Sequence, residues 1–208
     1  MSPLSVYRKL LEEFGPQNWW PAGRNFKPKE WEICLGAVLT QNTNWKNVEK
    51  ALDNLAARKI LSPADILHLE QTELEQIVRP SGFYKQKAKR LKALAEFVLS
   101  FGGFENFRKN VKRSELLGVE GIGPETADSI LLYACGRPYF VIDAYTRRLV
   151  RHLGWDKKFG LKTDYESLRE FFERNLPRDV PLYKEFHALI VEWGKTGGKS
   201  LYRSPAKN

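Results

Sequence analysis

Hydrophobic side chains recur along this chain at the three- and four-residue spacing of amphipathic helices. Between residues 4 and 14 they share one helical face, and Gly15-Pro16 then predicts the end of that helix. The same spacing predicts helices at residues 29–39, 48–57, 63–68, 86–100, 144–153, 165–175 and 182–193, and another that starts at Glu70 or Thr72 and passes Ile77. Only residues 139–142 read as extended chain, so the pattern predicts an all-α fold.

Two further helices, joined by a short bend, are predicted in the region of about residues 114–134. A short helix at 113–117, with Ser114 as its cap, precedes the bend. Pro124 fits the first turn of the helix that follows, because the N–H that proline lacks would be unsatisfied there in any case. Apolar residues then recur on one face of this second helix as far as Ala134. The sequence therefore predicts a tight connection between two packed helices.

The bend between these helices reads Gly-Ile-Gly. Gly121 and Gly123 can adopt positive φ and have no side chain to keep a ligand from the backbone. Their N–H groups lie at a helix N-terminus, where an anion is favoured. A packed corner without a ligand is the alternative, but the longer pattern Gly-Ile-Gly-Pro-x-Thr-Ala, which includes Thr126, favours phosphate binding.

Composition narrows the class of partner. The chain has 208 residues and a net charge of +9, which favours a polyanion such as DNA. It has no run of 18 apolar residues and no secretory pattern at its start, so we expect no membrane span. Cys34 and Cys135 are the only cysteines, too few for a four-cysteine cluster or a structural zinc site. Free thiols without a signal peptide indicate a reducing, cytoplasmic location.

Two polar or aromatic loops carry candidate binding residues. Trp19, Trp20 and Pro21 follow the first helix, and adjacent tryptophans cannot both face one way, so at least one is expected to line a groove; coverage of the core edge is the plainer alternative. Gln41 and Asn42 belong to a polar run after a buried helix. That run is either a simple connection or a set of amides that fill the gap left by an extruded nucleotide. Trp45 follows and is a second candidate pocket wall.

The densest basic cluster follows a loop at residues 79–83. Lys85, Lys87, Lys89 and Arg90 lie at the start of the predicted helix, close to Gly82 and Tyr84. Such runs are usually solvated, but cations in a first helical turn oppose the helix dipole, so a phosphate partner is favoured here. By contrast, Gly194–Ser200 does not match a nucleotide-binding P-loop, because Trp193 stands where that motif requires glycine.

The bend and the segment that follows it resemble one known family. Leu116–Asp128 resembles the helix-hairpin-helix of the endonuclease III superfamily of DNA glycosylases, and Pro138–Leu149 resembles the apolar run and catalytic aspartate of that superfamily. Trp19–Pro21, Gln41–Thr43, residues 79–84 and the missing iron–sulfur cysteines are most similar to its 3-methyladenine glycosylases. The resemblance covers most of residues 17–195 and implies double-stranded DNA with a damaged base as the partner.

The resemblance assigns chemistry to Asp143 and Glu125. Aspartate before a helix is ordinarily a cap, but the family aspartate stabilises positive charge on the sugar or activates water as the base leaves. Glu125 stands where bifunctional members carry the lysine that forms a Schiff base, so a monofunctional enzyme that leaves an abasic site is implied. Glu125 is either a pocket residue or simply an acid favoured at a helix N-terminus.

The same resemblance implies further site residues. An alkylated, cationic purine would stack on Trp19, Trp20 and Trp45, with Pro21 beside them and with Gln41 or Asn42 as the DNA wedge. Phosphates would be held by Gly121, Gly123, Thr126, Gly82, Tyr84, Lys85 and Lys87. Leu189 replaces a lysine that related enzymes place near the pocket, which predicts a pocket of different polarity. Family hairpins often bind a monovalent cation, here at the carbonyls of Val119, Gly121 and Ile122.

The implied architecture is a monomer of two helical lobes with a DNA-binding cleft. Residues 29–134 would form the central lobe, and residues 1–28 with 135–208 the other. No cofactor and no iron–sulfur cluster are expected. A glycosylase for an oxidised or mismatched base remains an alternative, as does a non-catalytic DNA-binding protein that uses the hairpin only to hold phosphate.

Overall fold

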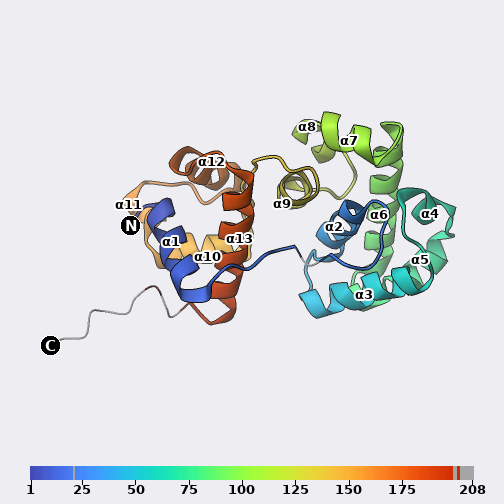
Figure 1. Cartoon of the computed structure of the whole chain (residues 1–208), viewed down its shortest axis with the longest axis horizontal. Coiled ribbons are helices and arrows are strands. Elements are labelled where there is room, and N and C mark those ends of the chain that lie inside the picture. The colour runs from blue at the N-terminus through green and yellow to red at the C-terminus, as the bar shows by residue number, and fades with distance from the viewer. Residues whose placement is uncertain (21, 199–200, 202–208) are drawn as a thin grey trace. The chain divides into compact units, whose positions relative to one another are not determined.

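A computed structural model describes residues 1–20, 22–198 and 201. The described residues contain helices and no strand, which confirms the predicted all-α class (Figure 1). None of these helices is both long and apolar enough to cross a membrane. The chain forms two compact units: Met1–Trp19 with Arg137–Asn208 is unit 1, and Trp20–Gly136 is unit 2.

Unit 1 joins the first helix to the C-terminal helices (Figure 1). Its helices are α1 (Pro3–Phe14), α10 (Ala144–His152), α11 (Trp155–Lys158), α12 (Tyr165–Asn175) and α13 (Val180–Lys195). α13 packs against both α1 and α10. Phe140 stacks on Phe172 with ring centroids 4.4 Å apart, and both are fully buried. Residues 139–142 are therefore buried extended chain that enters the core, and no strand forms there.

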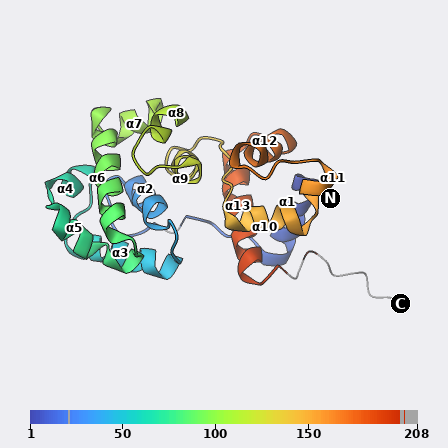
Figure 2. The same cartoon turned by 180° about the vertical axis from the view of Figure 1, so that it is seen from behind.

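Unit 2 is built around α2, whose residues from Trp31 to Leu39 are all buried. Its helices are α2 (Lys29–Leu39), α3 (Trp45–Ala57), α4 (Pro63–His68), α5 (Gln71–Ile77), η1 (a 3₁₀ turn, Arg79–Ser81), α6 (Tyr84–Ser100), α7 (Phe104–Asn110), α8 (Arg113–Leu117) and α9 (Pro124–Ser129). α2 packs against α3, α6 and α9. Figure 2 shows the long α6 beside α2 from behind. A helix that is apolar on all sides is expected at the centre of such a unit.

Local signals in the sequence explain most helix ends, with some exceptions. Ser2, Asn44, Ser62, Asp164 and Asp179 each accept a hydrogen bond from a backbone N–H in the first turn of their helix. α8 begins after Lys112, so the prediction of Ser114 as its cap is wrong. Glu115 accepts from the Lys112 N–H at 2.6 Å and fixes that start. α7 and α11 were not predicted.

The helix after the hairpin changes its winding within the core. α9 runs directly into a π-helical turn, η2 (Ile130–Ala134), in which the Cys135 N–H donates to the carbonyl of Ile130 at 3.0 Å. A bond to the fifth residue back is the signature of a π turn. The turn packs against α2, and Tyr133 within it is almost fully buried. The π turn therefore sets which side chains reach the centre of unit 2.

The boundary between the units differs from the predicted boundary at residues 20–28. These residues belong to unit 2, because buried Glu32 accepts from the N–H groups of Gly23 and Arg24. The Arg24 side chain donates to Glu32 at 2.6 Å and to Asp53 at 2.5 Å. This segment is thus fastened to α2 and α3 by charged hydrogen bonds.

Gly36 is a testable determinant of this packing. A Cβ at Gly36 would lie 2.9 Å from Cζ2 of Trp20, so Gly36→Ala must displace the indole. We expect a net loss of about 1–2 kcal/mol in unfolding free energy, since overpacking costs more than the gain in helix propensity. Urea unfolding and the indole N–H resonance of Trp20 measure the two effects.

Gly23→Ala is the matched control, because its Cβ would meet no atom within 4 Å and its φ is not positive. That variant should stay within about 0.5 kcal/mol of the parent. An unshifted Trp20 resonance in Gly36→Ala would show that the glycine is not needed for the indole.

Candidate active site and DNA-contacting surfaces

Asp143 caps α10 and keeps its charge. Its Oδ1 accepts from the N–H of Thr146 at 2.7 Å and from the Thr146 hydroxyl at 2.9 Å. Its Oδ2 lies 3.6 Å from Nε2 of His187. Burial alone would raise the pKa of the Asp143 carboxyl group, but His187 and the Thr146 hydrogen bonds outweigh burial, and the pKa lies below its ordinary value. Asp143 is therefore a carboxylate at neutral pH, fixed in direction.

His187, which lies against Asp143, is itself buried beside an aromatic ring of unit 1. His187 lies on α13 and is 5% exposed, and the ring of Trp19 lies 5.8 Å from the His187 ring, tilted by 43°. Asp143 itself keeps 15% of its side chain exposed. A charge held between two helices with limited access to water is a suitable arrangement for stabilising positive charge on a bound group.

Trp19 and Trp20 have different ring partners, Trp19 in unit 1 and Trp20 in unit 2; the expectation that at least one of them lines a groove stays a prediction. Trp20 lies in unit 2, where its ring is 5.2 Å from the ring of Trp45, nearly perpendicular, and 5.2 Å from the ring of Tyr133. Trp20 and Trp45 are both partly exposed residues, although the indole nitrogen of Trp20 is buried. The structure thus places Trp19 against His187 in unit 1 and brings Trp20 and Trp45 together in unit 2. Pro21 lies outside the described residues.

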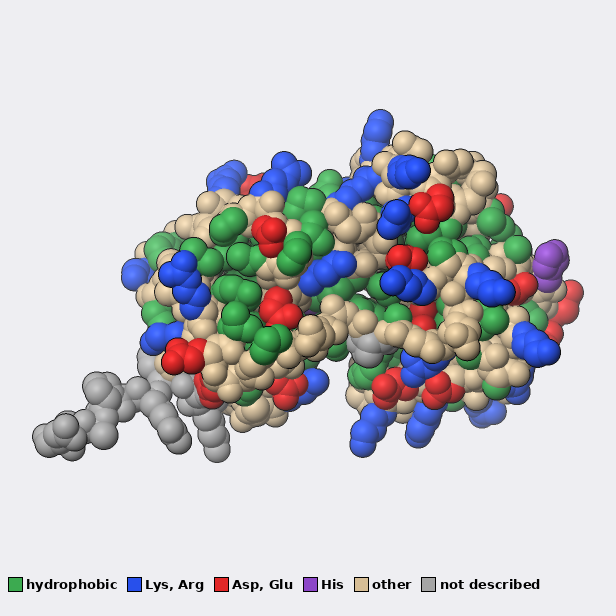
Figure 3. Space-filling view, viewed as in Figure 1, with side chains coloured by type: hydrophobic (Ala, Val, Ile, Leu, Met, Phe, Trp, Pro, Cys, Tyr) green, Lys and Arg blue, Asp and Glu red, His purple; other side chains and the backbone are tan. Residues whose placement is uncertain are grey.

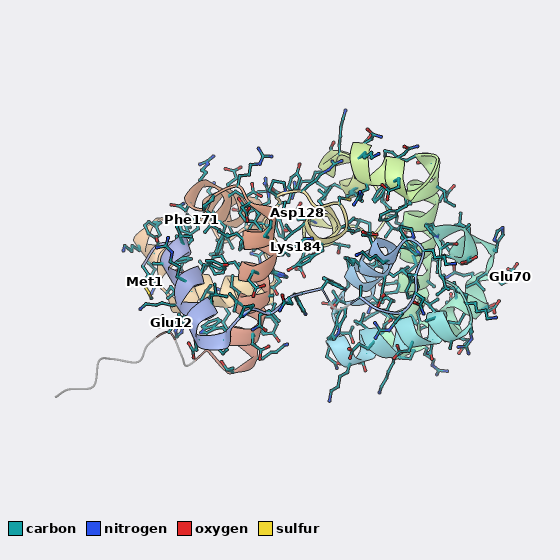
Figure 4. All side chains as sticks on the ribbon, viewed as in Figure 1. Met1, Glu12, Glu70, Asp128, Phe171 and Lys184 are labelled. Carbon is teal, nitrogen blue, oxygen red and sulfur yellow. The ribbon has the colours of Figure 1, made fainter. Side chains whose placement is uncertain are left out.

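The hairpin between α8 and α9 is held by a buried ion pair. Arg113 donates to both carboxylate oxygens of Asp128, at 2.6 and 3.1 Å, and Asp128 has no exposed surface. Figure 4 labels Asp128 on α9. A two-bond guanidinium–carboxylate contact fixes both distance and angle. The two helices of the hairpin are therefore locked before any ligand binds.

The bend itself faces solvent. Glu120, Gly121 and Gly123 are exposed, and Gly121 has a φ of 78°. Within the described part of the chain, the N–H groups of these three residues donate no hydrogen bond. Ile122 is buried and anchors the bend. Exposed donors at the start of a helix match the predicted phosphate site.

Thr126 and Gln41 meet beside the hairpin. Gln41 Nε2 donates to the Thr126 hydroxyl at 2.9 Å and to the Gly121 carbonyl at 3.1 Å, and Thr126 is only 5% exposed. This is not the exposed position that a side-chain contact between Thr126 and phosphate needs. Asn42, by contrast, is exposed and has a left-handed φ of 53°.

The structure corrects the prediction for Lys87. Lys87 is fully buried, and its ammonium donates to the carbonyls of Leu39 at 2.8 Å and Ser81 at 2.6 Å. Those carbonyls end α2 and η1, so the lysine satisfies helix C-termini rather than a phosphate. The spacing of the helix indicates that Lys87 faces inward, because it lies four residues before Leu91 and seven before Leu94 on the apolar face of α6. Lys85 is exposed and stays a phosphate candidate.

Phe83, which the sequence reading did not select, is the most exposed large hydrophobic residue in the described chain. It is 62% exposed and has a left-handed φ of 47° immediately before α6. A bulky residue in this conformation is strained, and such strain is concentrated at functional positions. Gly82, with φ of 68°, precedes it, and Tyr84 follows, with its ring 5.7 Å from the guanidinium of Arg79. Two adjacent aromatic residues after a glycine, Gly82-Phe83-Tyr84, were the feature of the sequence that could have indicated an exposed aromatic side chain here.

Two further candidate site residues, Glu125 and Leu189, differ from each other in exposure. Glu125 is exposed in the first turn of α9. Leu189 is fully buried in α13, and the different polarity that it predicts for the pocket stays a prediction. Lys and Arg side chains also gather on the face that bears α7 and α8 (Figure 3).

No group of three or more metal-binding side chains occurs among the described residues. Two of the three carbonyls proposed for a hairpin cation already accept hydrogen bonds: Val119 from the N–H of Ile122 at 3.0 Å, and Gly121 from Gln41. A carbonyl oxygen can accept twice, so the cation site stays a prediction.

The fold, the hairpin and the capped aspartate together define a class of enzyme. Residues 35–178 match the family described as HhH-GPD superfamily base excision DNA repair protein. This chain belongs to that superfamily, and it is a DNA glycosylase of base excision repair.

Among individual relatives, the chain is 47% identical to a protein of Methanocaldococcus jannaschii named "Putative DNA repair glycosylase", over 90% of this chain and 84% of the relative. The crystal structure of H. pylori 3-methyladenine DNA glycosylase bound to 1,N6-ethenoadenine is similar at 36% identity and a TM-score of 0.82, covering 95% and 99% of the two chains. A trapped endonuclease III–DNA covalent intermediate shares the fold, at 20% identity and a TM-score of 0.75, covering 99% and 91%.

Lys87 makes the free energy of unfolding depend on pH in the alkaline range. Burial, and then the charge of Arg90, lowers the pKa of Lys87 from 10.5 to about 8. Between these values the unfolded chain binds a proton that the folded chain lacks, so the Lys87 contribution to unfolding free energy rises with pH. Urea unfolding at pH 7–10 should show this rise, relative to Lys87→Met.

Lys85→Met is the control for that experiment, because Lys85 is exposed on the same helix. Its pH profile should follow the parent protein. If Lys87→Met kept the full alkaline slope, Lys87 would not be the group responsible.

Proposed function

We propose that this glycosylase hydrolytically releases N-alkylated purines of the 3-methyladenine type from double-stranded DNA and leaves an abasic site. The observation that carries this proposal is the fixed, ionised Asp143 beside Trp19 and His187. The similarity to the H. pylori 3-methyladenine glycosylase over nearly the whole length of both chains supports the substrate class.

Asp143 provides the negative charge that the reaction needs. As the bond between C1′ and the purine nitrogen breaks, its electron pair leaves with the base and positive charge develops on the sugar. The carboxylate, with Oδ1 fixed by Thr146, stabilises that charge. Water then bonds to C1′, and its proton passes to Asp143. No protonation of the base is required, because an N-alkylated purine is already cationic.

Aromatic side chains provide the selectivity. A cationic base is attracted to an aromatic face by about 0.5–2 kcal/mol per contact. Trp19 stands beside the His187–Asp143 pair, and Trp20 with Trp45 forms a second partly exposed group. We assign Trp19, in the unit that carries Asp143, to the recognition of the base; the pocket roles of Trp20 and Trp45 stay predictions. Buried Leu189 leaves this recognition without a lysine at the expected position.

Duplex binding is assigned to exposed groups of unit 2. Backbone N–H groups at Gly121 and Gly123 bind phosphate, and Lys85, Gly82 and Tyr84 contact a second part of the backbone. Phe83, exposed beside them, supplies an apolar surface for a base or sugar. Monomeric binding to damaged DNA is sufficient for this arrangement.

The test of the substrate class is base release from methylated DNA, with the released base identified. Asp143→Asn keeps a good N-cap for α10 but removes the charge, so we expect release to fall by about 10²–10⁴-fold. Affinity for the duplex should change little. Retained turnover in this variant would exclude Asp143 from the reaction, and release only of oxidised or mismatched bases would reject the substrate class.

Asp164→Asn is the matched control for this substitution. Asp164 likewise caps α12 by accepting from the N–H and the hydroxyl of Ser167, three residues on, but it is exposed. That variant should keep the parental rate of base release, so that a loss seen only in Asp143→Asn reports the chemistry.

The type of glycosylase is tested by borohydride trapping. Glu125 occupies the position of the Schiff-base lysine and cannot form an imine. With the protein saturating an alkylated duplex, we expect base release but no covalent protein–DNA adduct on denaturing gels. A trapped adduct with this protein would overturn the monofunctional assignment; a bifunctional endonuclease III is the positive control.

A further inference from the structure

The side chain of Gln41 connects three elements of unit 2. Its Nε2 donates to the Gly121 carbonyl in the hairpin and to the Thr126 hydroxyl on α9. Its Oε1 accepts from Nη1 of Arg90 on α6 at 2.5 Å. The loop that carries Gln41 is thereby joined to the hairpin and to α6 at the same time.

The geometry allows only one orientation of this amide. Rotated by 180°, the amide would set its oxygen against the Gly121 carbonyl and its NH₂ group against the Arg90 guanidinium, and both contacts would be repulsive. As observed, both Nε2 hydrogens are used and the oxygen accepts from a cation. Charge-assisted bonds of this kind are the stronger ones in proteins. Insertion of Gln41 into a base stack would break all three bonds.

Arg90 is seated directly on the hairpin. A Cβ at Gly121 would lie 2.3 Å from Nε and 2.5 Å from Cδ and Cγ of Arg90, so the guanidinium fits only because this residue is glycine. Gly121 also has the positive φ that the bend requires. Gly121 therefore has two functions, the turn and the seat for Arg90.

Asn42 has the opposite character. It is exposed, its backbone is left-handed, and its side chain makes no hydrogen bond to any other described residue. The amide is therefore available without the loss of an existing contact. Its position directly after Gln41 means that any restraint on Gln41 also fixes the place of Asn42.

We propose that Gln41 and Arg90 are positioning residues, which clamp the loop of residues 40–44 to the hairpin, and that Asn42 alone enters the duplex. This inference rests on the proposed function, because it concerns how the enzyme occupies the gap left by the extruded nucleotide. The Gln41 clamp, made of Gln41, Arg90, Thr126 and the Gly121 carbonyl, fixes the distance from the inserted amide to the phosphate-binding bend. Because the loop is already ordered in the folded protein, the entropy cost of ordering it is not subtracted from the free energy of binding.

The clamp is first tested without DNA. In the free protein, Arg90→Met should shift the side-chain NH₂ resonances of Gln41, whereas Lys89→Ala, an exposed neighbour on α6, should leave them unchanged. Unshifted resonances in Arg90→Met would overturn the clamp. This measurement needs no activity, so it separates failure of the clamp from failure of the proposed function.

Insertion is tested with a duplex that carries an abasic analogue, with 2-aminopurine opposite it as the reporter of unstacking. Asn42→Ala should abolish the fluorescence change with little effect on affinity. Gln41→Ala and Arg90→Met should each reduce the rate of that change by about tenfold, and the double variant by no more than either single variant. The proposal would be rejected if the reductions in rate multiplied in the double variant, or if Asn42→Ala kept the parental fluorescence change.

Gln41→Glu distinguishes positioning from simple stability. Glutamate still accepts from Arg90 but cannot donate to the Gly121 carbonyl, so we expect the same slow insertion as in Gln41→Ala at unchanged urea midpoint. A parental insertion rate in Gln41→Glu would show that the hairpin contact has no role. If the parent protein inserts normally but releases no base from any lesion, the proposed function fails and the clamp stands.

Discussion

Two cations on one face of α6 hold the exposed loops of unit 2 in place. Lys87 and Arg90 are three residues apart, so both side chains project from the same side of the helix. Lys87 donates to the last carbonyls of α2 and η1, and Arg90 donates to Gln41. The loop after α2, the loop before α6 and the hairpin thus share one support. Burying a lysine is unfavourable. The carbonyls of Leu39 and Ser81 offset that cost only while the ends of α2 and η1 stay beside Lys87.

In unit 1, the carboxylate that we propose for the reaction, Asp143, is also a structural group. Asp143 gives α10 its N-terminal cap through Oδ1, and this leaves Oδ2 directed towards His187. A cap is rigid because its partner is the backbone, which cannot change rotamer. The fold therefore fixes the position of the charge through the same bonds that start the helix. Preorganisation of this kind needs no reorganisation as the transition state forms.

The sequence predicted the helical class and most helices, because spacing and caps are local signals. α12 begins and ends where the pattern of residues 165–175 predicts. α7 and α11 were missed because both are short and follow a glycine without a side-chain cap, whereas the equally short α4 is marked by Ser62. The role of Lys87 was wrong for a different reason: the charge run was read as exposed as a whole, although Lys87 lies four residues before Leu91 on the apolar face of α6. Long-range contacts such as Gln41 with Gly121 leave no local signal at all.

The π turn at Ile130–Ala134 affects how this sequence is aligned with those of its relatives. A π turn holds one more residue than an α turn over the same axial rise, so it behaves as a single-residue insertion inside a helix. Tyr133, within the turn, lies with its ring 5.2 Å from the ring of Trp20. An alignment with a relative whose helix is uninterrupted needs a one-residue gap here, or residues from opposite faces will be equated.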